Sequence, residues 1–167
     1  MPIDINVPAG HAPAIRPVPV APICQLSVIV PIFNEEAVIA QFHARLIQVL
    51  ASCPGVHEII YVDDGSTDSS RQVLEGIRQV CPQVGVARLS RNFGKERAMT
   101  AGLEMARGEA VIILDVDLQD PPELIPRMLD AWRNAGPGRT GIGTTLSGSL
   151  LQIAALHAGF WRAHGAP

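Results

Sequence analysis

The sequence lacks the features of a nucleic-acid-binding protein. Aromatic residues make up only 4% of the 167 residues, and the formal net charge is −3. Proteins that bind a phosphate backbone usually carry a basic patch, and those that bind single strands combine basic residues with stacking aromatics. The chain has neither pattern, so we expect no nucleic-acid partner.

Cysteine is also scarce. Cys24, Cys53 and Cys81 are odd in number and widely spaced, and they form neither a CxxC pair nor a cluster of metal ligands. This usage favours a reducing, cytoplasmic compartment. The N-terminus has no basic start followed by an apolar core, so no secretory signal is predicted.

Several motifs for nucleotide binding and acyl transfer are missing. No GxGxxG follows the first expected strand and no GxxxxGK[ST] occurs, which leaves a dinucleotide-binding fold and a P-loop enzyme unsupported. No Ser-His-acid or Cys-His arrangement is visible, and for His43, on an expected helix, a structural role is favoured. A phosphate-bearing ligand would therefore need a cation in place of a glycine-rich cradle.

Apolar runs and helical periodicity alternate along one domain-sized chain. Residues 1–25 are rich in proline and are predicted to form a disordered leader. From Leu26 the pattern predicts four strands, each followed by a helix. The strands are expected at 27–32, 58–62, 84–89 and 110–114, and the helices from Asn34 to about 51, after Ser66, from the Lys95 loop to Ala106, and over about 122–134. This βαβαβαβ order predicts an α/β fold with a Rossmann-like parallel sheet and helices on both faces.

The acidic segment 115–123 follows the last of these strands. On an extended backbone alternate side chains point to the same side, so Asp115 and Asp117 lie on one side with their Cα atoms roughly 6.6 Å apart. One carboxylate would bind a divalent cation and the other a ribose hydroxyl. Oxygen ligands of this kind suit Mg²⁺ or Mn²⁺.

Polar residues follow two other expected strands, and parallel sheets bind ligands beyond these carboxyl ends. After the first strand, Asn34 and the two glutamates suit a helix N-terminus, which is a sufficient structural explanation. Alternatively, Pro31 and Asn34 shape a nucleotide pocket and Glu36 hydrogen-bonds a base.

The second such segment, 63–68, also allows two interpretations. Gly65 suits a turn and the next residues suit a helix cap, but two adjacent acids remain unexplained. Since adjacent side chains point opposite ways, one of Asp63 and Asp64 would face the pocket and accept a hydrogen bond from a base. Arg91 and Lys95 lie either in a solvated loop or near a diphosphate, whose charge they would help to hold.

Four segments together carry a family resemblance that none carries alone. They are SVIVPIFNEE at 27–36, VDDGSTD at 62–68, SRNFGK at 90–95 and DVDLQDPPE at 115–123. In this order and at matching strand ends, they resemble family 2 glycosyltransferases over roughly residues 26–136. More narrowly, they look like the polyprenyl-phosphate branch, which includes dolichol-phosphate mannosyltransferase and undecaprenyl-phosphate glucosyltransferases.

The resemblance implies a GT-A-type fold and an inverting, metal-dependent transfer of a sugar from a UDP- or GDP-sugar donor to a polyprenyl phosphate. The protein would then work at the cytoplasmic face of the membrane. It implies Asp115 and Asp117 as catalytic residues, and Asp117 and Gln119 as ligands of Mg²⁺ or Mn²⁺. The nucleotide-sugar site would consist of Pro31, Phe33, Asn34, Glu36, Asp63, Asp64, Arg91, Lys95 and Asp115.

The resemblance stops after about residue 136. No Asp or Glu occurs after Asp130, and residues 140–161 contain no charged side chain apart from the histidine at 157. We therefore expect 137–167 to be a divergent tail from a truncated or frame-altered chain, with a membrane-contacting or dimer-forming helix as one possibility. Donor binding would then survive without transfer. A transferase with a saccharide acceptor and a non-catalytic nucleotide-binding fragment remain alternatives.

Overall fold

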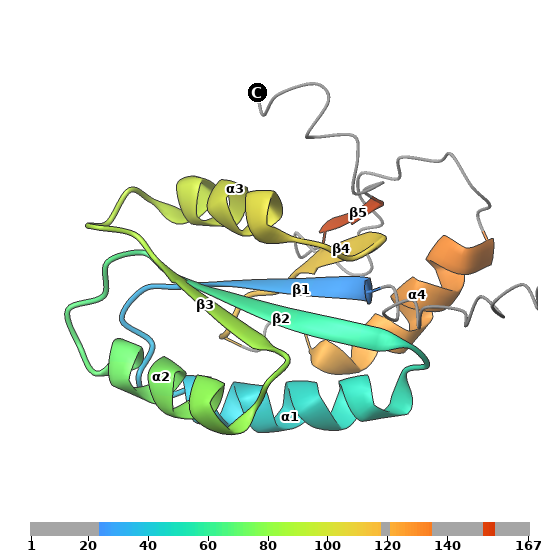
Figure 1. Cartoon of the computed structure of the whole chain (residues 1–167), viewed down its shortest axis with the longest axis horizontal. Helices are drawn as coiled ribbons and strands as arrows, with labels where there is room; N and C mark the ends of the chain where they lie inside the picture. Colours follow the sequence, from blue (N-terminus) through green and yellow to red (C-terminus); the bar gives the residue numbers. More distant parts are fainter. Residues whose placement is uncertain (1–23, 118–120, 135–151, 156–167) are drawn as a thin grey trace, which may run out of the picture.

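The computed structural model describes residues 24–117, 121–134 and 152–155 (Figure 1). Five strands form one sheet in the order β3-β2-β1-β4-β5. They are β1 (Cys24–Ile32), β2 (Val56–Asp63), β3 (Val84–Arg88), β4 (Ala110–Ile113) and β5 (Gln152–Ala155). The first four pair in parallel, as the sequence predicts, whereas β5 pairs antiparallel with β4.

Strand β5 is a departure from the expected tail. The composition of 137–167 leaves a helix as one possibility, but its described part, 152–155, is a strand. The backbone groups of β5 pair with β4, which lies far away in the sequence, so local periodicity carries no sign of the strand. The rest of the tail and the leader up to residue 23 lie outside the described residues, as does Gln119.

Helices cover both faces of the sheet (Figure 1). One face carries α1 (Ile39–Ser52), α2 (Ser70–Val80), the short helix η1 (Pro122–Leu124) and α4 (Ile125–Asn134), and the other carries α3 (Lys95–Met105). Along β1, Val28 and Val30 pack in the core beneath α1, while Ile29 packs with the residues beneath α3. This is the alternation expected of a strand that is buried on both sides.

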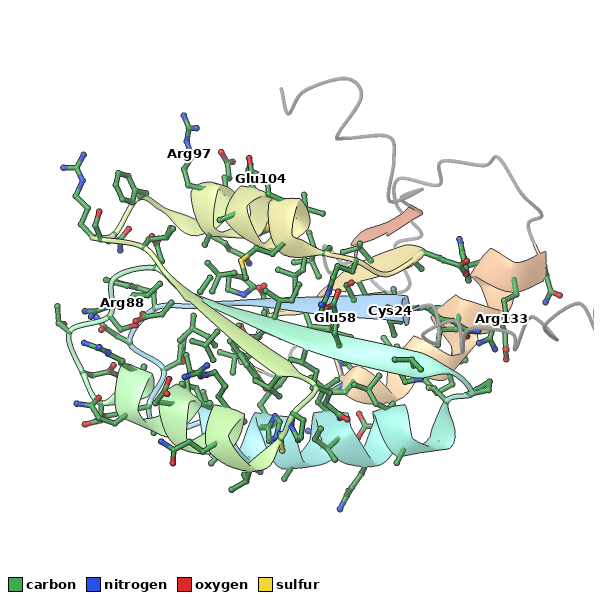
Figure 2. All side chains as sticks on the ribbon, in the orientation of Figure 1. Cys24, Glu58, Arg88, Arg97, Glu104 and Arg133 are labelled. Carbon is green, nitrogen blue, oxygen red and sulfur yellow. The ribbon has the colours of Figure 1, made fainter. Side chains whose placement is uncertain are left out.

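The outer surface of α3 carries charged side chains. On α3, Arg97 and Glu104 point away from the sheet (Figure 2). Within the part of the chain that the structure describes, no helix is both long enough and apolar enough to span a bilayer.

Helix α1 begins later than the sequence pattern predicts. Asn34 has a φ of 56°, in the left-handed region, so the chain turns there instead of starting a helix. The carbonyl of Glu35 then accepts the N–H groups of Val38 and Ile39 at 3.0 and 3.2 Å. The N-cap position is Val38, and the expectation that Asn34 caps this helix is wrong.

The strand order fixes where a ligand site can form. From β1 the chain proceeds to β2 and β3 on one side, and then returns to place β4 on the other side of β1. This reversal brings together the carboxyl ends of β1 and β4. Open α/β sheets bind ligands at such a switch point, beyond the strand ends.

Candidate functional site

A cavity of about 320 Å³ opens at the carboxyl ends of β1 and β4. Its walls come from the ends of these strands, from the loops after β2 and β3 and from the start of α3. They are formed by Pro31, Ile32, Phe33, Glu35, Asp64, Asn92, Gly94, Lys95, Ala98, Asp115, Val116 and Asp117. The segments that the sequence singles out at three strand ends therefore each contribute at least one residue to the same cavity.

Asp115 and Asp117 both line this cavity, with Val116 between them. Val116 is almost fully buried and belongs to the core beneath α1, which anchors the segment to the sheet. Lys95, the first residue of α3, places its Nζ 2.5 Å from Asp115 Oδ2. The two acids thus face the cavity from one short segment, and Lys95 is a cationic partner of Asp115.

Glu35 adds a further acid that the sequence does not single out as a cavity residue. Partial burial raises the pKa of its carboxyl, and the negative charges of Asp117, Asp68 and Asp115 raise the pKa further. A raised carboxyl pKa shows that negative charge has accumulated around this wall of the cavity. Such a wall favours a bound cation.

The described residues place carboxylates at the cavity but form no complete metal site. The cavity offers carboxylate oxygens, which suit Mg²⁺ or Mn²⁺. Among residues 24–117 and 121–134, however, no three His, Cys, Asp or Glu side chains are grouped closely enough to hold a metal ion by themselves. A cation at this position would need further ligands, and the predicted ligand Gln119 lies outside the described residues.

Asp64 lines the cavity, but its carboxylate is held by backbone groups. Its Oδ1 accepts the N–H of Phe93 and its Oδ2 accepts the N–H of Gly94, both at 2.8 Å. The residue is only 3% exposed. In this structure Asp64 therefore fixes the loop that leads into α3 and Lys95, and its predicted contact with a base stays a prediction.

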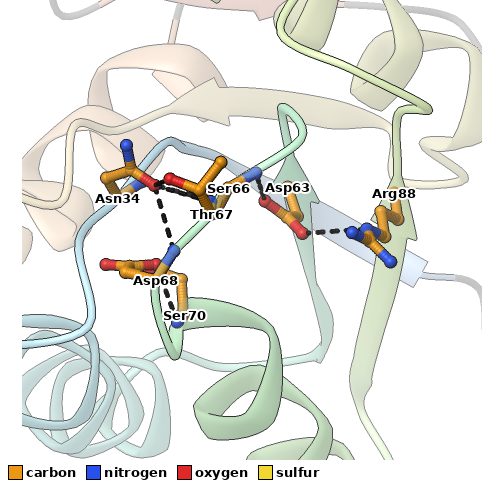
Figure 3. A network of polar contacts seen from close by, with 7 residues as sticks. All are labelled: Asn34, Asp63, Ser66, Thr67, Asp68, Ser70 and Arg88. Atoms are coloured by element: carbon orange, nitrogen blue, oxygen red, sulfur yellow. Dashed lines mark hydrogen bonds and ion pairs between the residues drawn. The ribbon is translucent and has the colours of Figure 1, made fainter.

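Asp63 points the other way, as expected for a neighbour on a strand. Its Oδ1 accepts the N–H of Ser66 at 2.8 Å, and its Oδ2 lies 3.5 Å from Nε of Arg88 (Figure 3). Asp63 is buried and does not line the cavity. Its contacts shape the turn after β2.

Asn34 and Glu36 connect two loops to each other. Oδ1 of Asn34 accepts the N–H groups of Thr67 and Asp68 at 2.8 and 3.4 Å (Figure 3). Glu36 Oε2 accepts the N–H of Ser69, the N-cap residue of α2, at 2.6 Å. Neither residue lines the cavity. Both fasten the loop after β1 to the loop that leads into α2, so they connect two loops and do not cap the helix that follows them.

Only one of the two predicted basic residues lies at the cavity. Lys95 lines the cavity, whereas Arg91 is not among its walls and stacks its guanidinium 4.7 Å from the ring centroid of Phe93. Gly94 has a φ of 96° and forms the N-cap of α3, a conformation that favours glycine.

The structure thus brings six of the predicted residues together at the cavity: Pro31, Phe33, Asp64, Lys95, Asp115 and Asp117. It leaves Asn34, Glu36, Asp63 and Arg91 outside the cavity walls. Two lining residues with polar side chains, Glu35 and Asn92, are not predicted as cavity residues, although each belongs to one of the four motif segments. Their places in the segments 27–36 and 90–95, which follow two strands, are the sequence signal that could have indicated them.

Comparison with known proteins gives a family. Residues 27–143 match the profile of the family described as Glycosyl transferase family 2. An uncharacterized glycosyltransferase of Synechocystis is 47% identical over 109 residues, which cover 65% of this chain and 34% of that protein. Bactoprenol glucosyl transferase of Shigella phage SfV is 40% identical over 109 residues, with 65% and 36% covered.

A third relative is undecaprenyl-phosphate 4-deoxy-4-formamido-L-arabinose transferase of Pseudomonas paraeruginosa. It is 43% identical over 111 residues, which cover 65% of this chain and 32% of that protein. The chain spans about a third of the length of these relatives.

Two solved structures show a similar fold. Mannosyltransferase PcManGT from Pyrobaculum calidifontis, in complex with GDP-Man and Mn²⁺, gives a TM-score of 0.52 at 28% identity, with 61% of this chain and 31% of that chain covered. TarS 1–349 of S. aureus gives a TM-score of 0.58 at 22% identity, with 83% and 48% covered.

Proposed function

Because the chain belongs to glycosyl transferase family 2, we propose that it forms the donor-binding part of a glycosyltransferase acting on a polyprenyl phosphate. The single observation that carries this proposal is the cavity where Asp115, Asp117 and Lys95 meet at the β1–β4 switch point. This cavity combines carboxylates, which would hold a nucleotide-bound cation, with a lysine ammonium group, which would hold a diphosphate.

The donor is a nucleotide-diphospho-sugar. The likeness to PcManGT, which is bound to GDP-Man and Mn²⁺, supports a donor and a divalent cation of this class. The relatives named for bactoprenol and undecaprenyl phosphate support a lipid phosphate as the acceptor. We place the protein at the cytoplasmic face of the membrane, where it would reach such a lipid.

Asp117 would hold the cation together with Gln119, and Asp115 would face the nucleotide. The bound Mg²⁺ or Mn²⁺ would neutralise charge on the departing nucleoside diphosphate. Lys95, which pairs with Asp115 in this structure, is positioned to hold negative charge on the diphosphate. Asp64 would keep Lys95 in place through the loop it fixes.

Transfer would proceed with inversion at the anomeric carbon. The acceptor phosphate is already anionic near neutral pH, so the chain need not supply a strong general base. Its residues must instead hold the donor in line with the acceptor. We assign donor binding to the described side chains that line the cavity.

Nucleotide binding in the presence and absence of a divalent cation tests this proposal. We expect UDP or GDP to bind at least about tenfold more tightly with Mn²⁺ than with EDTA, measured by calorimetry. Asp117→Asn should remove most of this gain, because an amide binds a divalent cation more weakly than a carboxylate. Glu104→Gln, on the outer side of α3 (Figure 2), is the matched control and should bind as the wild type does.

Equal affinity with Mn²⁺ and EDTA would contradict the cation site. Transfer is tested separately with a labelled donor and a polyprenyl phosphate. Formation of a labelled lipid supports the proposed acceptor, and donor binding without such a product would restrict the chain to the donor half of the reaction.

A further inference from the structure

The acidic segment 115–123 is held to α1 near both of its ends. Near its amino end, Val116 is almost fully buried and belongs to the core cluster beneath α1. At its carboxyl end, Glu123 lies in η1, which packs against α1. The cavity residues Asp115 and Asp117 flank Val116, so their placement depends on how this segment is fixed to α1.

Arg45 of α1 makes the polar contact at the carboxyl end of the segment. Its Nη2 donates to Oε1 and to Oε2 of Glu123, both at 2.9 Å, and its Nε donates to Oε1 at 3.2 Å. The two residues stand 78 positions apart in the sequence, so the contact joins parts of the chain that no local structure connects. A guanidinium that binds both oxygens of a carboxylate fixes the orientation of the two groups as well as their separation.

Glu123 carries the negative charge that this contact requires. A hydrogen bond from its own backbone and those from Arg45 hold the pKa of its carboxyl below the ordinary value, so it is ionised at neutral pH. Both side chains are partly exposed to solvent. Exposed ion pairs usually add little to stability, but a bidentate arginine–carboxylate pair keeps a defined geometry. A role in orientation therefore fits this pair better than a role in overall stability.

A second ion pair in the chain shows the difference. Nη2 of Arg78 lies 2.6 Å from Oε1 of Glu75, and both side chains are partly exposed, as in the first pair. These two residues are three positions apart on the same helix, α2, and neither lines the cavity. Of the two pairs, only Arg45 and Glu123 connect α1 to the segment that carries the cavity acids.

We propose that Arg45 is a positioning residue for the cation site and that it acts through Glu123. This inference rests on the proposed function, in which Asp117 binds the cation. Arg45 is not among the cavity walls. It holds the carboxyl end of segment 115–123 against α1, while Val116 holds the amino end in the core, so that the carboxylate of Asp117 stays at the cavity. Replacing a residue that orients a metal ligand without touching the metal typically costs about 10–100-fold in metal affinity.

The test measures the Mn²⁺ concentration at which binding of UDP or GDP to the intact chain is half-maximal. In Arg45→Gln and Glu123→Gln this concentration should rise about tenfold, because Asp117 loses its fixed position. The affinity for the nucleotide in EDTA should stay at the wild-type value, since the ion pair does not line the cavity. Arg78→Gln, which breaks the pair on α2, is the matched control and should leave both quantities unchanged.

Exchanging the two charges separates positioning from a simple loss of charge. Arg45→Glu alone places two carboxylates together and should weaken Mn²⁺ binding more than Arg45→Gln does. Adding Glu123→Arg to this variant restores an ion pair between α1 and η1, and it should recover at least about threefold in Mn²⁺ affinity. Without any recovery in a folded double variant, the inference would be wrong.

Two further results decide between this inference and its alternatives. A Mn²⁺ requirement that Arg45→Gln and Glu123→Gln leave unchanged would overturn the inference while the cation site stands. A loss of nucleotide affinity that is equal with Mn²⁺ and with EDTA, together with a lower free energy of unfolding in urea, would mean a purely structural role and would also overturn it. If wild-type protein binds the nucleotide equally well with Mn²⁺ and with EDTA, the proposed function itself fails, and this inference fails with it.

Discussion

Asp64 contributes to the candidate site by fixing a loop, a role that needs no contact with a ligand. Both of its carboxylate oxygens accept backbone N–H groups, from Phe93 and from Gly94. Lys95, which pairs with Asp115, follows directly in the chain. A single buried carboxylate therefore sets the position of the base that faces the acidic wall of the cavity.

Replacing this carboxylate by an amide tests the role. In Asp64→Asn one of the two N–H groups faces an NH₂ group, and an unsatisfied buried donor costs about 1–3 kcal/mol. We expect a fall of that size in the free energy of unfolding, measured with urea, and faster amide exchange at Phe93 and Gly94. Asp130→Asn, on an exposed position of α4, is the control and should be near neutral. Equal effects of the two substitutions would argue against the role of Asp64.

Single residues also mark the limit of prediction from sequence. The pattern around Asn34 and Glu36 predicts that they cap the helix that follows them, but in the fold they accept backbone N–H groups of the loop before α2. Similarly, the alternation along a strand predicts that one of Asp63 and Asp64 faces the site. It does not show that Asp64 is already occupied by backbone N–H groups, because that loop comes from a distant part of the chain.

At the scale of elements, α3 lies close to the sheet because it has a glycine at the contact. A Cβ built on Gly102 would lie 2.5 Å from Cγ2 of Ile29 on β1. Gly76, inside α2, has no neighbouring atom within 4 Å of such a Cβ. Both glycines lie in helices, and they differ in how closely neighbouring atoms pack around them.

These two glycines should respond in opposite ways to alanine. Gly102→Ala forces α3 away from β1 and should lower the free energy of unfolding by about 1–3 kcal/mol. Gly76→Ala gains helix propensity without a clash and should raise it by about 0.5–1 kcal/mol. Urea unfolding of both variants decides the matter. If Gly102→Ala were as stable as Gly76→Ala, the packing of α3 against Ile29 would be looser than the structure indicates.

The elements themselves were largely predictable because their apolar residues repeat with a local period. The four parallel strands and the helices that follow them lie close to their expected positions. Strand β5 differs because its partner β4 lies far away in the sequence. The start of α1 differs because the left-handed backbone of Asn34 depends on contacts with the loop after β2.

For the whole molecule, the alternating order of strands and helices was sufficient to predict the architecture. The parallel sheet and the likeness to solved glycosyltransferases confirm the GT-A-type fold. The strand order places the candidate site at the carboxyl ends of the strands. At the opposite end of the sheet, where the strands begin, a buried acid holds several segments together.

Glu58 is that acid, and it joins three parts of the chain. It accepts the hydroxyl of Ser27 on β1 at 2.6 Å and the backbone N–H and guanidinium of Arg107, just before β4, at 2.7–2.9 Å. The N–H of Gly108 donates to the Ser27 hydroxyl at 2.8 Å. Burial by itself raises the pKa of Glu58, but the hydrogen bonds from Ser27 and Arg107 outweigh it and hold the pKa below the ordinary value of 4.5.

The lowered pKa of Glu58 predicts a pH dependence of stability. The ionised carboxylate stabilises the fold above the unfolded-state pKa near 4.5, and this contribution is lost as the pH falls through the lower folded-state value. Glu58→Gln should therefore lower the free energy of unfolding at pH 7 by about 2 kcal/mol, since bonds to a charged group are replaced by weaker ones. The difference from wild type should shrink steadily below about pH 4.

Urea unfolding at several pH values measures this difference, with Glu109→Gln, an exposed neighbour, as the control. The control should match wild type across the range. A Glu58→Gln deficit that is the same at pH 7 and at pH 3 would mean that the lost interaction is not electrostatic. A loss of stability that shrinks on acidification means that the charged form of Glu58 links β1, β2 and the segment before β4. These contacts lie at the end of the sheet opposite the cavity.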